Sequence, residues 1–247
     1  RAAVAVFTVC VLLRVAAGQQ TAVQAQRAAA EARRAEWEAK IAEAEAAALR
    51  RSGVEVQVAA LGSTMAQRCA QSNSFGADVH NCVHTNACNG KASGTHLFCY
   101  SSKKSSAGYK ACKAVMDVLG PVTPGTSDVI RAYPALFEVK YPAAPTVYIE
   151  VDFHDVPRIA QWLIDNTIFI GETIAKGLCN ALGVKFVESA NQTAPVPVPV
   201  AQDVTIPMQV RMLRRGMEGA DVKTLQAALI AYGFSCGAAG ADGDFVA

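Results

Sequence analysis

The 247-residue sequence lacks the excess of positive charge that draws proteins to nucleic acid. Its 23 lysines and arginines nearly balance its 21 acidic residues, which leaves a formal net charge of +2. Binding to nucleic acid without sequence preference depends on a strongly basic surface. We therefore expect no nucleic-acid partner.

The sequence also lacks any CxxC pair, the spacing typical of zinc ribbons and of thioredoxin-like redox motifs. Half of the chain is hydrophobic, so it can bury a core without a framework of disulfides. We expect reduced, mostly buried thiols, which favours folding in a reducing compartment. The eight cysteines lie at wide, uneven intervals: Cys10, Cys69, Cys82, Cys88, Cys99, Cys112, Cys179 and Cys236.

An apolar run at residues 2–13 is too short to cross a membrane as a helix, and we expect no stable membrane association. Three interpretations of the run stay open. It resembles a short signal-peptide core followed by small residues. It is also compatible with the first buried strand of the fold, or with sequence of doubtful origin, since the chain opens without Met.

Helical and strand patterns alternate along the central part of the chain. Residues 21–51 are rich in Ala, Glu, Arg and Gln and contain neither Gly nor Pro, which predicts one long helix capped by Gly53. Such alternation is typical of an α/β fold with a mainly parallel or mixed sheet and helices on both faces. Further helices are predicted at 65–74, 109–119 and 158–182, and strands at 54–58, 77–87, 95–100, 136–141 and 146–153.

The chain divides into four parts. The bounds of the first two, an atypical N-terminal segment at residues 1–35 and a main domain at residues 36–188, are what the family resemblance of residues 36–187, given below, implies. The proline-rich stretch 189–209 predicts a stiff extended linker, because proline cannot pair centrally in a sheet. Residues 210–247 predict a small, separate helical unit, with Val222, Leu225, Leu229 and Ile230 on one helix face.

His84 is the first candidate for chemistry, because it lies near the carboxyl end of a predicted strand and is followed by Thr85 and Asn86. Open α/β sheets bind ligands at that edge. The alternative is a structural histidine held by hydrogen bonds. His80 lies on the same strand face four residues earlier, which is too far for both imidazoles to reach one metal easily.

Glu150 is the second candidate, because it ends an apolar strand and a buried, unpaired charge is costly. Asp152, His154 and Asp155 add polar groups to the following loop. A structural role as the cap of a helix that begins near Pro157 suits Asp155 and does not suit Glu150.

Three segments together resemble the catalytic domain of zinc-dependent N-acetylmuramoyl-L-alanine amidases: HTNA, PTVYIEVDFHD and AQWLIDN. The resemblance covers about residues 36–187. It implies that His84 is a zinc ligand, that Glu150 is the catalytic glutamate, and that the metal site is completed by a second histidine and a glutamate. The implied reaction is hydrolysis of the amide between N-acetylmuramic acid and the L-alanine of the peptidoglycan stem peptide.

The sequence departs from the family pattern at two ligands. No histidine precedes His80, so the family's first histidine has no counterpart. The family's glutamate ligand, seven residues before the position of Ile41, falls on Arg34, which cannot bind zinc. Glu31 or Glu36 would serve only if the helix register shifted. The alternative to an active enzyme is therefore a disabled homologue that only binds the cell wall.

The C-terminal segment resembles a peptidoglycan-binding module. After Phe245 the family pattern continues with Gly and a further helix, whereas this chain reads Val246, so we expect an incomplete module. The matching positions are Arg214, Gly216, Gly219, Val222, Leu225, Gln226, Asp242, Gly243 and Phe245.

Together the two resemblances imply peptidoglycan as the partner, zinc as the cofactor and a monomer that acts at the cell wall outside the cell. Release through a phage pore or a signal peptide are the two export routes that stay open. Other hydrolase classes are disfavoured: no GxSxG motif offers a serine nucleophile, and Glu150 has no clear carboxylate partner for glycosidase chemistry.

Overall fold

The computed structural model describes residues 3–8, 22–60, 62–190, 194–197, 213–231, 236 and 239–245. The chain divides into two compact units between Pro197 and Val198, and each is described by itself. Among the described helices, none combines the length and the apolar character needed to cross a membrane.

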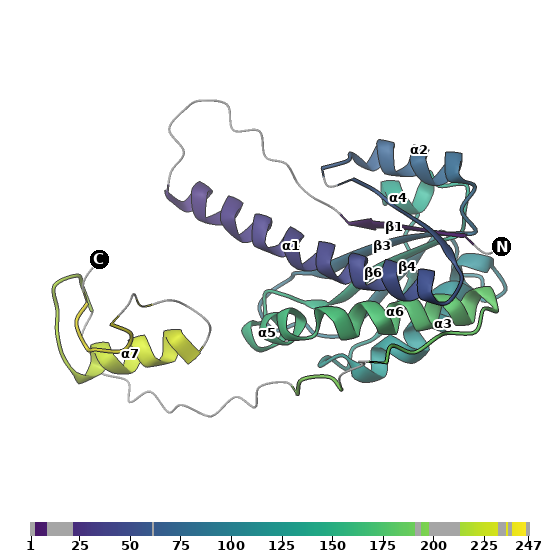
Figure 1. Ribbon diagram of the computed structural model, residues 1–247. Helices are drawn as coiled ribbons and strands as arrows, with labels where there is room; N and C mark the ends of the chain where they lie inside the picture. Colours follow the sequence, from purple (N-terminus) through teal and green to yellow (C-terminus); the bar gives the residue numbers. More distant parts are fainter. Residues whose placement is uncertain are drawn as a thin grey trace. The chain divides into compact units, whose positions relative to one another are not determined.

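The larger unit is built on a mixed six-stranded sheet, which confirms the predicted α/β class (Figure 1). The strands are β1 (Ala3–Thr8), β2 (Glu55–Val58), β3 (Val79–Asn86), β4 (His96–Cys99), β5 (Val129–Ala132) and β6 (Thr146–Phe153). Their order is β2-β1-β3-β6-β4-β5. All neighbouring pairs are parallel except β4 and β6, which are antiparallel.

Helices cover both faces of this sheet (Figure 1). On one side lie α1 (Ala22–Arg51), α3 (Ala107–Leu119) and α6 (Thr167–Leu182); on the other lie α2 (Met65–Phe75) and α4 (Phe137–Lys140). The turn η1 (Gly120–Val122) follows α3, and α5 (Pro157–Asp165) precedes α6. Because side chains alternate along a strand, β3 directs Asn81 towards Glu45 of α1, and its neighbour His80 towards Glu138 of α4.

Helix α6 packs closely along both α1 and α3, and two glycines allow this. A Cβ atom at Gly171 would lie 2.5 Å from the carbonyl oxygen of Ile41 in α1. A Cβ atom at Gly177 would lie 2.6 Å from the Cα atom of Val115 in α3. Both distances are too short for any side chain, so these contacts require glycine.

Several local predictions are confirmed. Residues 22–51 form one helix, and Ala3–Thr8 form a strand of the sheet, which was one of the three interpretations of the run 2–13. Residues 9–13 of that run lie outside the described residues. Helix α2 begins with a capping box between Thr64 and Gln67 and ends at Gly76 in the left-handed conformation.

The segment 136–141 was predicted as a strand, and this prediction is wrong, because it contains the short helix α4. Consecutive residues of a strand point to opposite faces, whereas Glu138 and Val139 are both buried. A helical turn allows Glu138 to reach Arg68 of α2 while Val139 also packs inward. The strand β5 was not predicted.

The single helix predicted at 158–182 is also wrong, since Asn166 separates α5 from α6. The Asn166 side chain donates to the carbonyl oxygen of Trp162 and accepts from the amide of Val196. These bonds hold its backbone away from helical geometry and attach the segment 194–197 to the larger unit.

The smaller unit contains helix α7 (Ala220–Ala231) and an antiparallel bridge between Glu218 and Asp244. The side chain of Gln226 donates to Asp242 and accepts from the amide of Gly243. Residues of the C-terminal sequence pattern are therefore joined by hydrogen bonds within this unit.

Candidate active site

His84 and Glu150 lie directly opposite each other in the parallel pairing of β3 with β6. Paired residues of neighbouring strands share a sheet face, so both side chains emerge on the same side at the carboxyl ends of their strands. They line a cavity of about 270 Å³. Its other lining residues are Arg34, Glu38, Met65, Thr85, Leu136, Phe137, Glu138 and Tyr148.

Glu150 has the properties of a proton-transfer group. Burial raises its pKa to about 7, with Glu38 adding to the effect and His84 and Arg34 opposing it. Its Oε2 atom is buried and accepts no hydrogen bond from the part of the chain that the structure describes. A carboxyl group with a pKa near neutrality can both accept and release a proton at physiological pH.

Glu38 of α1 is a site residue that the sequence analysis did not name. Its Oε1 atom accepts hydrogen bonds from the backbone amide and the hydroxyl of Thr85, both at 2.9 Å. Its Oε2 atom lies 3.7 Å from Nδ1 of His84, an electrostatic contact rather than a hydrogen bond. No signal in the sequence singles out Glu38, because α1 contains several glutamates at similar spacing.

Neither carboxylate considered as a substitute ligand lines the cavity: Glu36 is exposed, and Glu31 is not among the lining residues.

The imidazole of His84 is held between Glu38 and the ring of Tyr148, on which it stacks at 4.7 Å. Burial lowers the pKa of His84, but Glu38 and then Glu150 outweigh that effect, so the net shift is upward. Its Nε2 atom is buried without a hydrogen-bond partner among the described residues.

The polar residues after Glu150 have different positions. His154 joins the edge of the site, because its Nδ1 lies 3.0 Å from the Thr85 hydroxyl that donates to Glu38. Asp152 accepts the amides of Gly94 and Gly125 and holds two loops together. The capping role suggested for Asp155 is wrong: this carboxylate accepts the amides of Cys88 and Gly90, and α5 has no side-chain cap.

His80 lies away from the cavity, in a buried group with Cys82 and Glu138 whose possible ligand atoms lie within 4.8 Å of one another. Arg68 already occupies both oxygens of Glu138, at 2.6 and 2.5 Å. Burial and Arg68 lower the pKa of His80 to about 3, which keeps it neutral. A second cation beside Arg68 would be repelled, so we assign this group a structural role.

The cavity contains residue types that bind zinc, but fewer ligands than the family pattern has. Imidazole nitrogen and carboxylate oxygen are common zinc ligands, and the unpartnered Nε2 of His84 suits a metal bond. Glu38 lies beside Nδ1, the other nitrogen of the same imidazole, so an ion bound at Nε2 would not reach this carboxylate. The family's first histidine still has no counterpart before His80.

The cysteines follow the prediction where they are described. Cys69, Cys82, Cys99, Cys112 and Cys179 are free and buried. Cys88 is free and exposed, and Cys236 is free and half-buried. Cys10 lies outside the described residues.

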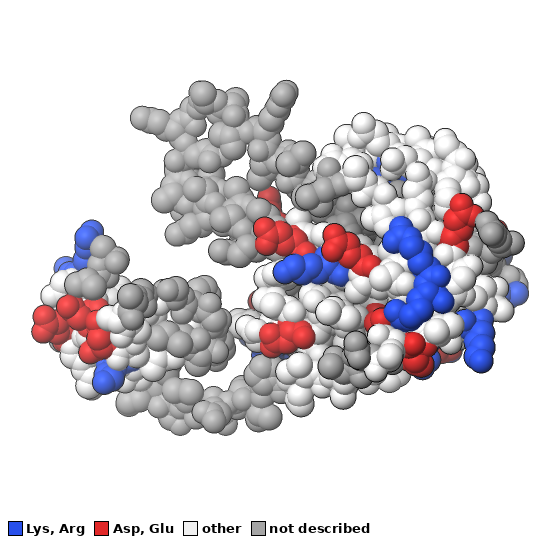
Figure 2. Space-filling model, in the orientation of Figure 1, with Lys and Arg blue, Asp and Glu red and all other residues white. Residues whose placement is uncertain are grey.

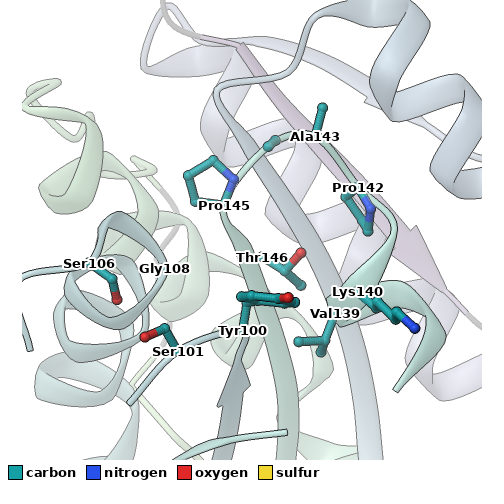
Figure 3. A pocket seen from close by; sticks show the side chains of 11 residues that line it. Tyr100, Ser101, Ser106, Gly108, Val139, Lys140, Pro142, Ala143, Pro145 and Thr146 are labelled. Atoms are coloured by element: carbon teal, nitrogen blue, oxygen red, sulfur yellow. The ribbon is translucent and has the colours of Figure 1, made fainter. Parts of the chain in front are cut away.

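A second cavity, of about 380 Å³, lies at the amino end of β6 (Figure 3). Tyr100 and Lys140 line it together with Thr146, which begins the strand. Thr146 precedes Glu150 by four residues, or roughly 13 Å along a strand. Its lining contains no carboxylate or imidazole, unlike that of the cavity with His84 and Glu150.

The charged surface is mixed, in agreement with the near-neutral sequence. On the face of the larger unit drawn in Figure 2, acidic and basic side chains lie interspersed.

Comparison with solved structures supports the fold. The catalytic domain of the N-acetylmuramoyl-L-alanine amidase CwlV from Bacillus (Paenibacillus) polymyxa var. colistinus is 17% identical, with a TM-score of 0.60. That match covers 75% of this chain and 100% of the other. An N-acetylmuramoyl-L-alanine amidase from Nostoc punctiforme is 14% identical, with a TM-score of 0.53 and coverage of 74% and 97%. At these identities the likeness shows a common fold.

The family is shown by sequence. No curated protein matches the chain. The family model described as N-acetylmuramoyl-L-alanine amidase matches residues 23–180, which is more than half of the chain. The match includes residues 23–35 of the segment predicted to be atypical, as well as β3, β6 and the cavity between them. The chain therefore belongs to the N-acetylmuramoyl-L-alanine amidase family of peptidoglycan hydrolases.

Proposed function

We propose that this chain hydrolyses the amide between N-acetylmuramic acid and L-alanine, with Glu150 as general base and with His84 as a zinc ligand. The observation that carries the proposal is the buried Glu150 carboxyl group, with a pKa of about 7, opposite His84 in one cavity. Groups with strongly shifted pKa values in a cavity are typical of active sites.

In this mechanism Glu150 takes a proton from the water that attacks the amide carbonyl. A carbon–oxygen bond forms, the carbon–nitrogen bond breaks, and Glu150 returns the proton to the amine of L-alanine as it leaves. The near-neutral pKa suits both steps, because neither protonation state of Glu150 is strongly favoured.

His84 is the residue that would hold zinc, through Nε2, and Glu38 would support its imidazole from the Nδ1 side. When bound, zinc would lower the pKa of water and polarise the carbonyl group. Thr85 donates two hydrogen bonds to Glu38, and His154 contacts Thr85 in turn, so this chain of contacts orients the Glu38 carboxylate. Such supporting contacts are typical of metal sites.

The proposal is tested by incubating the purified chain with peptidoglycan sacculi, with and without a chelator, and measuring newly freed L-alanine amino groups. We expect release that the chelator abolishes, and that Glu150→Gln and His84→Ala each remove. Glu43→Gln is the control, because it neutralises an exposed carboxylate of α1 that does not line the cavity. Release by Glu150→Gln at the wild-type rate would refute the assigned role.

A disabled homologue that only binds the cell wall is the second candidate. Two observations favour it: no histidine precedes His80, and Arg34 lines the cavity at the register of the family's glutamate ligand. In that case the folded chain would sediment with sacculi and release no amino groups.

We further propose peptidoglycan as the partner of both units and the cell wall, outside the cell, as the place of action, by a monomer. The proposed organisation is an atypical segment 1–35, a catalytic domain 36–188, a linker 189–209 and a wall-binding module that includes residues 210–247. Sedimentation of residues 1–197 with sacculi, compared with the full chain, tests whether the smaller unit adds affinity.

A further inference from the structure

Cys99 and Cys112 bring two buried thiols together outside the proposed active site. Cys99 ends β4, and Cys112 lies in α3, which packs against that strand. The Cys112 thiol lies 3.7 Å from the carbonyl oxygen of Phe98, the residue before Cys99. A Cβ atom at Gly108, one helical turn before Cys112, would lie 3.4 Å from the Cβ of Cys99. The two side chains therefore meet where β4 contacts α3.

The two thiols are hydrogen-bonded to each other, and this bond separates their acidities. The Cys112 thiol lowers the pKa of Cys99 to about 7, against the effect of burial. The Cys99 thiol and burial raise the pKa of Cys112 well above its usual value. Near neutral pH a large fraction of Cys99 is therefore thiolate, the form that attacks an oxidant, with the Cys112 thiol beside it.

The pair lies behind the wall of the cavity of about 380 Å³ shown in Figure 3. The Cys99 sulfur lies 3.2 Å from the carbonyl oxygen of Ser101, and the Cys112 sulfur lies 3.9 Å from that of Thr146. Ser101 and Thr146 both line the cavity, and so does Gly108, which has no side chain to thicken the wall. Little more than main-chain atoms therefore separates the thiols from a small molecule in this cavity.

We propose that Cys99 and Cys112 form a redox-active pair, which closes into a disulfide when hydrogen peroxide enters the cavity. The Cys99 thiolate attacks one peroxide oxygen, the oxygen–oxygen bond breaks, and the hydroxide that leaves takes up a proton to become water. Cys99 is then a sulfenic acid. Because the two thiols are already in contact, closing the bond between them requires little movement of the backbone.

The second step joins the two sulfurs. Cys112 attacks the sulfenic sulfur of Cys99, a sulfur–sulfur bond forms, and the sulfur–oxygen bond breaks. The leaving hydroxide combines with the Cys112 proton as water. In sum, two thiols are oxidised to one disulfide and one hydrogen peroxide is reduced to two waters. The reaction needs neither zinc nor amidase activity, so it is independent of the proposed function.

The test treats the folded full chain with hydrogen peroxide at pH 7 and alkylates the remaining thiols after denaturation. Unreduced tryptic peptides are then identified by mass spectrometry. Trypsin cuts between the two cysteines at Lys103 and Lys110, so the disulfide joins two peptides, lighter by two hydrogens than their sum. We expect the link between Cys99 and Cys112, and its loss on reduction with dithiothreitol. Cys179, a buried thiol of α6, is the internal control and should remain alkylated.

Two outcomes would overturn the proposal. One is full alkylation of Cys99 and Cys112 under conditions that oxidise the exposed Cys88. The other is a disulfide between another pair, such as Cys69 with Cys82, in place of this one.

Two variants test the order of attack. In Cys112→Ser the sulfenic acid of Cys99 has no partner and should be labelled by dimedone, whereas Cys99→Ser should leave Cys112 unlabelled. Labelling of Cys112 in Cys99→Ser, with none of Cys99 in Cys112→Ser, would overturn the assigned order. Circular dichroism checks that each variant folds, with Cys→Ala as the replacement where serine prevents folding. The disulfide mapping uses the wild type and so does not depend on any variant.

Discussion

Two carboxylates on the same side of the sheet, those of Glu138 and Glu150, differ in their hydrogen-bond partners. Glu138 is bound at both oxygens by Arg68, whereas Oε2 of Glu150 accepts no hydrogen bond from the described residues. Glu138 is buried, and Glu150 is partly exposed with its Oε2 atom buried. The pair with Arg68 satisfies the Glu138 carboxylate and serves the structure, whereas burial raises the pKa of Glu150 to about 7, which suits proton transfer.

The largest effect is expected when the proton-transfer group Glu150 is replaced. Glu150→Gln should lower amidase activity by about 10²–10⁴-fold, the usual contribution of general base catalysis. Its stability should be unchanged or higher, because an unpaired buried carboxyl group is lost. Assays of amino-group release together with urea unfolding would check both parts. A stability loss like that of a paired residue would show that Glu150 is structural.

The second change breaks the structural pair. Arg68→Met leaves Glu138 buried without its cation and should cost about 3–5 kcal/mol of unfolding free energy. The double variant Arg68→Met, Glu138→Gln should recover much of that loss, since no buried charge remains. Urea unfolding followed by tryptophan fluorescence reports on the larger unit, where Trp37 and Trp162 both lie. A double variant as unstable as the single one would contradict the explanation.

A third change concerns a carboxylate that backbone amides hold. Asp152 is fully buried and accepts the amides of Gly94 and Gly125, both at 2.8 Å. Asp152→Asn turns an acceptor into a group with donors of its own, and should cost about 1.5–3 kcal/mol. The loss should be smaller than that of Arg68→Met, because no charge is left unpaired. Urea unfolding of the two variants in parallel would test this order.

Much of the fold could be predicted from sequence, because its long elements have strong local signals. The helix α1 follows from its composition, and β3 and β6 follow from their apolar runs. The short elements could not be predicted, because they lack such local signals. Four residues of α4 carry too little pattern, and their helical shape is imposed by the contact between Glu138 and Arg68, 70 positions apart.

The site was predicted in part. His84 and Glu150 follow apolar strand residues, which suggested function, and the structure brings them into one cavity, although β6 continues past Glu150 to Phe153. Glu38 could not be chosen from its neighbours by composition, because α1 contains several glutamates at similar spacing. Its selection depends on the packing of α1 against β3, which only the folded chain defines.

The last prediction concerns Glu45, another fully buried carboxylate, which is held by an amide instead of a cation. Asn81 donates to both of its oxygens, at 2.9 and 3.0 Å. Burial raises the pKa of Glu45 well above its usual value, and the bond from Asn81 offsets only part of that shift. Glu45 is thus intermediate between the paired Glu138 and the unpaired Glu150.

The raised pKa makes a stability prediction with a definite sign. The folded state holds the Glu45 proton more tightly than the unfolded state, so its contribution is present below about pH 4 and is lost as the pH rises towards the folded pKa. The loss is at most about 1.4 kcal/mol per pH unit. Glu45→Gln removes the titrating group, so unfolding free energy should fall less between pH 4.5 and 7.5 than in the wild type. The exposed Glu43→Gln should retain the wild-type slope, and an equal slope in Glu45→Gln would show that Asn81 keeps the carboxylate ionised.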